Sequence, residues 1–144
     1  LKIGIIGTHK FFGTLVFSLV VIRLMWKYIF NTHPKYEDIP MFHKIISNLV
    51  HFTLYLLVII IPIQGTFMTW LGGGDVYILG LLKVTPLIEM DFMLYPQALK
   101  IHYYSALTLT GIFSLHILAA LYHRLIINDK YGVWKRMAFI KRKV

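Results

Sequence analysis

The sequence predicts an all-α fold, an integral membrane helical bundle of three transmembrane helices that forms one domain over residues 1–144. Hydrophobic residues make up 58% of the chain, and the mean hydropathy of +0.68 is too high for a soluble domain of this length. Three apolar runs, at about residues 3–30, 42–70 and 96–127, each exceed the roughly 20 residues that a helix needs to cross a bilayer. These observations predict contact with membrane lipid.

Two connections separate the predicted helices. The first, Thr32–Pro40, contains two prolines and mixed charge, which interrupt a helix. The second begins at the glycines that follow Leu71 and ends at Pro96. It contains an apolar segment, Val76–Leu82, which is too short to span and which we expect at the end of the bundle or in the membrane interface.

The net charge of +9 predicts the orientation of the chain. Lys and Arg gather at helix ends and in the tail between Lys135 and Lys143, whereas a nucleic-acid-binding protein needs a basic face. No nucleic-acid partner is therefore expected. Positive charge marks the cytoplasmic side, and it is concentrated in the first connection and the C-terminal flank. The first helix should then run inward, and the C-terminus should lie in the cytoplasm.

The chain contains no cysteine, which limits its chemistry. Disulfides, iron–sulfur clusters and thiolate catalysis are excluded, so any redox centre must use histidine. The sequence shows no nucleophile with a positioned base and no acid–base pair, so we assign no catalytic residue.

The most informative residues are His102 and His116, which lie 14 positions apart in the third apolar run. A helix turns about 100° and rises about 1.5 Å per residue, so the second imidazole returns to within about 40° of the first and lies about 21 Å deeper. One helix face thus offers nitrogen ligands at two depths. This arrangement suits two haems stacked across a membrane, each iron completing its coordination on a neighbouring helix, and it indicates electron transfer.

Residues on the other two helices match these depths. His9 lies near the outer start of the first helix, so we expect His9 and His102 to ligate one outer iron, and His116 to ligate an inner one. Arg23 follows His9 by 14 positions, at the depth of His116, where a guanidinium suits a haem propionate. His51 lies near the same inner level, as an iron ligand or as a propionate, quinone or structural partner.

Further candidates for the cofactor site are three glycines and a lysine. Gly13, Gly65 and Gly111 lack side chains at depths where space for a macrocycle is needed, although membrane glycines also serve helix packing. Lys100 is expected to pair with a propionate, as Arg23 is.

The remaining histidines lie nearer the helix ends. His123 is on the face of His116 but close to the cytoplasmic end, so we expect it in the interface. His33 and His43 belong to the polar connection and its edge, where they should be solvated.

Several short motifs carry a family resemblance. They are Thr8-His9-Lys10 with Gly13, Val21-Ile22-Arg23-Leu24, Asn48-Leu49-Val50-His51 with Tyr55-Leu56-Leu57, Pro62-Ile63-Gln64-Gly65, Lys100-Ile101-His102 and Leu115-His116. With them the chain resembles the bacterial cytochrome b561 family, four-helix membrane proteins with two b-type haems. The match covers the family's second, third and fourth helices.

The resemblance implies that His9 and His102 ligate one haem b and that His116 ligates the other. It also exposes a departure, because the family's first helix, which supplies the fourth iron ligand, has no counterpart in this sequence. We expect the missing ligand from a segment before Leu1 or from a second subunit; a chain that truly began at Leu1 should bind a single haem or recruit His51.

The expected function is transmembrane electron transfer in the bacterial inner membrane, as an electron carrier or a quinone-linked oxidoreductase. A membrane quinone is the expected exchange partner, with a redox protein or small reductant at the other end. Residues at both ends of the bundle are candidates for the quinone site: Trp70 and Lys83 at the outer end, and Arg23, Trp26 and His51 at the inner end.

Two alternatives stay open at this point. The same histidines would serve a cytochrome b subunit that anchors a larger dehydrogenase or hydrogenase and receives electrons from a docked protein. They would also serve a membrane protein without redox activity, in which histidines relay protons. An absorption spectrum separates the second alternative from the others, because only a haem protein shows a reduced α-band.

Overall fold

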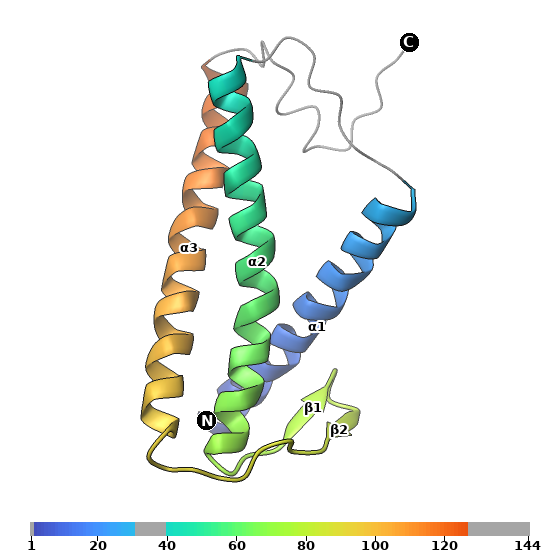
Figure 1. Ribbon diagram of the computed structural model, residues 1–144, viewed down its shortest axis with the longest axis vertical. Helices are drawn as coiled ribbons and strands as arrows, with labels where there is room; N and C mark the ends of the chain where they lie inside the picture. The colour runs from blue at the N-terminus through green and yellow to red at the C-terminus, as the bar shows by residue number, and fades with distance from the viewer. Residues whose placement is uncertain (1, 31–39, 127–144) are drawn as a thin grey trace.

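The computed structural model describes residues 2–30 and 40–126. Within them the chain forms three long helices and, between the second and third, two short strands: α1 (Lys2–Ile29), α2 (Met41–Leu71), β1 (Val76–Ile78), β2 (Leu82–Val84) and α3 (Tyr95–Leu125) (Figure 1). The starts of all three helices and the ends of the first two agree with the predicted spans to within one residue. The predicted end of the last span, residue 127, lies outside the described residues.

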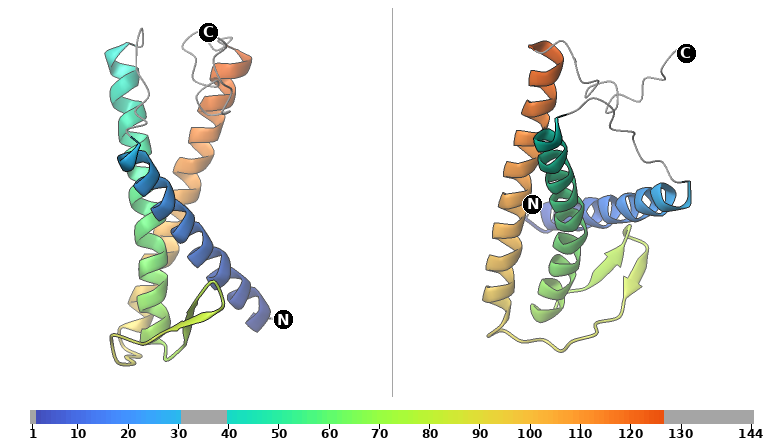
Figure 2. Two further views of the ribbon diagram at one scale, coloured as in Figure 1. Left: turned by 90° about the vertical axis from the view of Figure 1, so that its right-hand side faces the viewer. Right: turned by 45° about the horizontal axis from the view of Figure 1, so that its top comes forward.

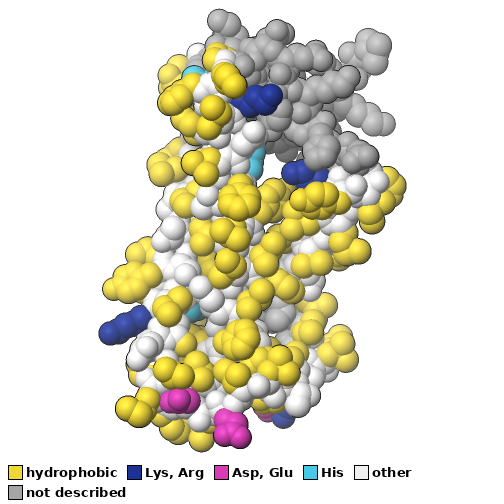
Figure 3. Space-filling view, viewed as in Figure 1, with side chains coloured by type: hydrophobic (Ala, Val, Ile, Leu, Met, Phe, Trp, Pro, Cys, Tyr) yellow, Lys and Arg dark blue, Asp and Glu magenta, His cyan; other side chains and the backbone are white. Residues whose placement is uncertain are grey.

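All three helices are suited to a bilayer. The spans Gly4–Ile29, Met41–Leu71 and Tyr95–His123 have mean hydropathies of 1.8, 2.1 and 1.6. Large apolar side chains point outward, and Figure 3 shows them over most of the visible surface. Such an apolar surface belongs in lipid, because a soluble protein rarely exposes contiguous apolar patches of this extent. The predicted membrane helical bundle is confirmed.

The helices are not packed equally. Helices α2 and α3 run antiparallel side by side, whereas α1 crosses α2 obliquely and diverges from the pair (Figures 1 and 2). Among the described residues α1 packs on α2 and on β1, but makes no direct backbone approach to α3. We call the end of the bundle that carries the two strands the hairpin end, and the opposite end the far end.

The segment between α2 and α3 forms a β-hairpin, which the sequence analysis did not predict. Strands β1 and β2 are antiparallel, with Val76 opposite Val84 and Ile78 opposite Leu82. Their turn has positive φ at two successive residues, 51° at Leu79 and 71° at Gly80, as a type I′ turn requires. The hairpin lies beside the first half of α1 at the end of the bundle, where the apolar segment was expected (Figure 2).

Backbone hydrogen bonds attach this connection to α2. The amide of Gly73 donates to the carbonyl of Trp70 at 2.9 Å, and the amide of Gly74 donates to that of Thr69 at 2.8 Å. Trp70 and Val76 are almost fully buried. The hairpin end is therefore a small folded core and not a loose loop.

Candidate functional site

Four histidines of the helices form two pairs. The ring centroids of His9 on α1 and His102 on α3 are 6.1 Å apart, with the ring planes at 88°. The centroids of His51 on α2 and His116 on α3 are 5.1 Å apart, with the planes at 73°. The two pairs lie 14 positions apart along α3, or about 21 Å. The structure thus brings imidazoles together at two depths of the bundle.

The spacing of His9 and His102 would allow both imidazoles to hold one metal ion. A metal–nitrogen bond to imidazole is about 2.0–2.1 Å long. Two imidazoles that held one ion between them would therefore have centroids about 6 Å apart, when about 1 Å is added for each ring. The observed 6.1 Å fits this requirement. Since the backbones of α1 and α3 do not approach within 8 Å (Cα–Cα) among the described residues, the two helices approach each other here through these side chains.

His102 rests against Gly65 of α2. A Cβ at position 65 would lie 3.2 Å from Cε1 of His102 and 3.6 Å from its Nδ1. The buried Nδ1 of His102 has no hydrogen-bond partner in the described part of the chain. A side chain at position 65 would therefore push the His102 ring out of its present position. The sequence analysis had instead expected Gly65 to leave space for the macrocycle.

The other two glycines lie in more open places. A Cβ at Gly13 or Gly111 would meet no atom of the described residues within 4 Å. Their role in leaving room for a macrocycle stays a prediction.

We predict that Gly65→Val displaces the imidazole of His102. The Cβ alone would approach the ring more closely than ordinary van der Waals contact, and the two added methyl groups leave the ring no space. Haem bound at the His9–His102 pair should then be lost or change its midpoint potential. Redox titration measures this, with Gly4→Val as the control because a Cβ at Gly4 would meet no atom of the described residues within 4 Å. Equal effects of the two substitutions would contradict the role of Gly65.

Two cations lie close to the His51–His116 pair. The Nε of Arg23 donates to the hydroxyl of Tyr55 at 3.2 Å. The Nζ of Lys27 lies 5.6 Å from the centroid of the same Tyr55 ring. Tyr55 is one helical turn from His51, about 6 Å along α2, so both cations are near the depth of this pair.

The sequence analysis placed Arg23 at this depth but missed Lys27. Lys27 could have been found from the sequence, because it follows Arg23 by four positions and therefore lies on the same face of α1.

The remaining candidates lie away from the two pairs or are exposed. Lys100 is exposed near the start of α3, two residues before His102. His43 is exposed near the start of α2, and His123 is partly buried near the end of α3. His33 lies outside the described residues.

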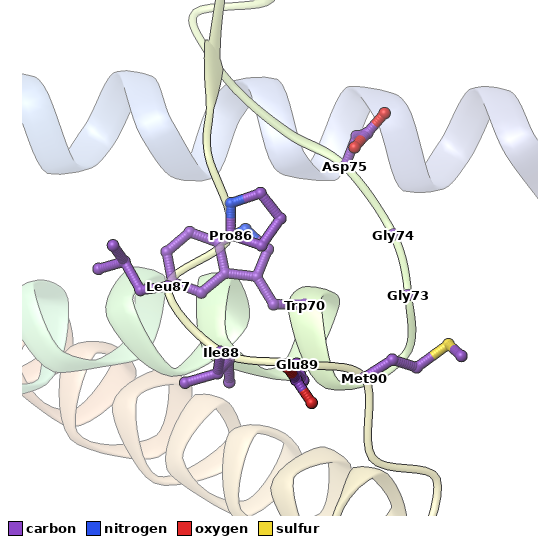
Figure 4. A pocket seen from close by; sticks show the side chains of 9 residues that line it. All are labelled: Trp70, Gly73, Gly74, Asp75, Pro86, Leu87, Ile88, Glu89 and Met90. Atoms are coloured by element: carbon purple, nitrogen blue, oxygen red, sulfur yellow. The ribbon is translucent and has the colours of Figure 1, made fainter.

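The hairpin end holds a pocket of about 450 Å³ beside Trp70. Figure 4 shows the indole of Trp70 between two arms of the connection, and the labelled residues form the lining: Trp70, Gly73, Gly74, Asp75, Pro86, Leu87, Ile88, Glu89 and Met90. Trp70, a quinone candidate, thus lines a cavity, whereas Lys83 is not part of this lining. At the far end Trp26 is 60% exposed and its ring lies 4.2 Å from that of Phe30.

Lys83 is paired with Asp75 instead. Its Nζ lies 2.9 Å from the carboxylate, and this hydrogen bond and ion pair raise the pKa of Lys83. The interaction is complete below the ordinary pKa of lysine and is lost as pH rises through the raised value. Because both side chains are about half exposed, the pair contributes little to stability.

These features define a class of protein, a membrane helical bundle with imidazole pairs held at two depths. Comparison with known families agrees with this class, because residues 2–139 match the sequence model of the family described as prokaryotic cytochrome b561. The match covers nearly the whole chain, which therefore belongs to the prokaryotic cytochrome b561 family. A search of curated proteins found no significant match. The family is one of multi-pass bacterial membrane proteins, and it implies b-type haem and transmembrane electron transfer.

Proposed function

We propose that this chain transfers electrons across the bacterial inner membrane through b-type haem, with His9 and His102 as ligands of one iron and His116 as a ligand of a second. Family membership supports the haem, and the 6.1 Å spacing of His9 and His102 is the observation that carries the assignment of ligands. An absorption spectrum of the purified protein tests it. We expect a sharp reduced α-band of bis-histidine haem b, and its absence would contradict the proposal.

The residues have distinct tasks in this function. A bound haem supplies an iron that accepts and releases one electron. His9 and His102 hold the iron from two helices, and the absence of a side chain at Gly65 lets the His102 ring take its position. Arg23 and Lys27 supply positive charge for propionates near His51 and His116. The apolar helices exclude water, which keeps the site in a low dielectric.

The quinone is the proposed exchange partner, and the pocket beside Trp70 supports a site at the hairpin end. Trp70 follows Gly65 by five positions, so the pocket lies about 7.5 Å along α2 from the contact with His102. Its apolar residues, such as Leu87 and Ile88, suit a ring that partitions into lipid.

We expect Trp70→Ala to slow reduction of the haem by a quinol while dithionite still reduces it fully, because the quinol requires a shaped site and dithionite does not. Stopped-flow absorbance in detergent or liposomes measures both rates. Trp26→Ala is the control at the far end, where Trp26 is exposed. If Trp26→Ala slows the quinol reaction and Trp70→Ala does not, the site lies at the other end.

Arg23→Leu should shift the midpoint potential of the haem ligated by His116 and spare the other. The reason is that Arg23 lies near the His51–His116 pair, and charge-assisted hydrogen bonds to propionates are about twice as strong as neutral ones. Redox titration resolves the two potentials. Tyr55→Phe, which removes only the hydroxyl bonded to Arg23, should have a smaller effect. Unchanged potentials, or a shift of the outer haem alone, would show that Arg23 is misplaced.

We propose that the hairpin end faces the periplasm and that the C-terminus is cytoplasmic. Acidic side chains gather at the hairpin end (Figure 3), where the connection carries Asp75, Glu89 and Asp91. Lys10, Lys83 and Lys100 also lie toward this end, but most of the Lys and Arg residues of the sequence belong to the first connection with its flanks and to the C-terminal flank, as the excess of positive charge on cytoplasmic segments requires. Because the chain has no cysteine, labelling of a Glu89→Cys variant by an impermeant thiol reagent in whole cells tests the orientation.

A further inference from the structure

We propose that the β1–β2 hairpin clamps α1 and thereby sets the position of His9 opposite His102, with Thr14 as the positioning residue. This inference rests on the proposed function, because it takes His9 and His102 as ligands of one iron. It assigns a task to a hairpin that neither ligates nor lies between the two rings.

The need for a clamp follows from the packing of the helices. The ring centroids of His9 and His102 lie 6.1 Å apart, yet the backbones of α1 and α3 do not come within 8 Å (Cα–Cα) of each other in the described part of the chain. The elements whose backbones lie close to that of α1, and which can therefore fix the position of His9, are α2 and the hairpin. Figure 2 shows α1 leaving the α2–α3 pair with the hairpin beside its first half.

Two hydrogen bonds join α1 to the hairpin. The Nζ of Lys10 donates to the backbone carbonyl of Asp75 at 3.1 Å, at the base of β1. The amide of Leu79 donates to Oγ1 of Thr14 at 3.1 Å, at the tip of the hairpin. Lys10 and Thr14 are one turn apart on the same helix face, and Lys10 directly follows His9. The turn of α1 that carries His9 is thus held at both ends of β1.

The hairpin is in turn fixed to α2 near the His102 contact. Gly74, which precedes the hairpin, donates to the carbonyl of Thr69 at 2.8 Å. The hydroxyl of Thr69 donates to the carbonyl of Gly65 at 2.8 Å, and Gly65 is the residue against which His102 rests. Hydrogen bonds therefore connect Gly65, which contacts the His102 ring, through Thr69 and Gly74 to the hairpin, and the hairpin is bonded to α1, which carries His9.

The turn of the hairpin is shaped for this contact. Leu79 has φ of 51°, a left-handed conformation that bulky residues rarely adopt, where Asn, Asp or Gly is usual in a type I′ turn. In this conformation its amide meets Thr14. A turn that served only to reverse the chain would not require the donor to be aimed at another helix.

Thr14→Val tests the clamp, since it removes the acceptor of the Leu79 amide and keeps the shape of the side chain. We expect haem at the His9–His102 pair to dissociate about 2- to 10-fold faster, the factor that corresponds to one neutral hydrogen bond. Its low-spin electron paramagnetic resonance signal should shift, while the signal of the other haem stays unchanged. Thr14→Ser should behave as the unmodified protein.

The matched control is Thr110→Val on α3. The Thr110 hydroxyl donates to the carbonyl of Ala106 at 2.9 Å, just as the Thr14 hydroxyl donates to the carbonyl of Phe11 at 2.9 Å, but among the described residues it accepts no hydrogen bond from the hairpin. The same substitution at Thr110 therefore removes a hydrogen bond within α3 and leaves the hydrogen bonds between α1 and the hairpin in place. Indistinguishable behaviour of the Thr14 and Thr110 variants would overturn the clamp.

A second measurement does not depend on haem. The chain has no cysteine, so a variant with Thr14→Cys and Leu79→Cys can form only one intramolecular disulfide. Oxidation should close this disulfide in high yield and leave the spectrum of the His9–His102 haem as in the unmodified protein. Failure to cross-link would overturn the clamp. Absence of haem from the unmodified protein would instead overturn the proposed function, so the two failures are distinguishable.

Discussion

Replacement of His102 by alanine should remove one haem, about half of the total if two are bound, and leave the other with an unchanged potential. His102 is half-buried against Gly65 and its ring lies opposite His9, and the other described histidines, His43, His51, His116 and His123, lie toward the far end of the bundle. Pyridine haemochrome analysis of the purified protein measures the haem content. His9→Ala should give the same loss, because both imidazoles are proposed to hold one iron.

The control for this prediction is His43→Ala, which removes an exposed imidazole near the start of α2. Its haem content should equal that of the unmodified protein. Full haem content in His102→Ala, or loss of haem in His9→Ala without loss in His102→Ala, would contradict a shared iron. In an experimental structure, an iron–nitrogen distance well beyond about 2.5 Å for either residue would also contradict it, since such bonds are near 2 Å.

Much of this arrangement is predictable from sequence because it depends on helical periodicity. The apolar runs are long enough to determine three helices, and 14 positions return a helix to nearly the same face, which puts His102 and His116 on one side of α3. His9 and His102 could be paired from sequence because each lies near the start of its helix, and both helices start on the same side of the membrane. The structure confirms that His9 and His102 approach each other, while their ligation of iron stays a prediction.

Other features depend on contacts that periodicity does not contain. The hairpin forms from two strands of only three residues, too short for an alternating pattern to stand out in an apolar segment. The contact of Gly65 with the His102 ring depends on how closely α2 and α3 approach, which the sequence of either helix alone does not determine. The oblique crossing of α1, and hence the role inferred for Thr14, arises from three-dimensional packing in the same way.

His116 lies at the other depth of α3, in the pair with His51. If two haems are bound, His116→Ala should remove the haem that His102→Ala spares, because the two residues lie about 21 Å apart along α3 and belong to separate sites. Difference spectra of the two variants should therefore be complementary, and their sum should reproduce the unmodified spectrum. Loss of the same haem in both variants would contradict two sites.

The iron proposed to be held by His116 needs a second ligand. The structure places the His51 ring 5.1 Å from that of His116, whereas the family resemblance assigns the partner to a helix without a counterpart in this sequence. For the 144-residue chain expressed alone we predict a haem-to-protein ratio near one, or a ratio near two in which His51→Ala removes the second haem. Each outcome follows from the same physical requirement, since low-spin haem needs two strong ligands: among the described histidines the ring of His51 lies beside that of His116, and their centroids would have to separate from 5.1 Å to about 6 Å to hold an iron between them. A ratio near two with low-spin spectra intact in His51→Ala would contradict both predictions, and would mean that the second ligand of this iron comes from another subunit.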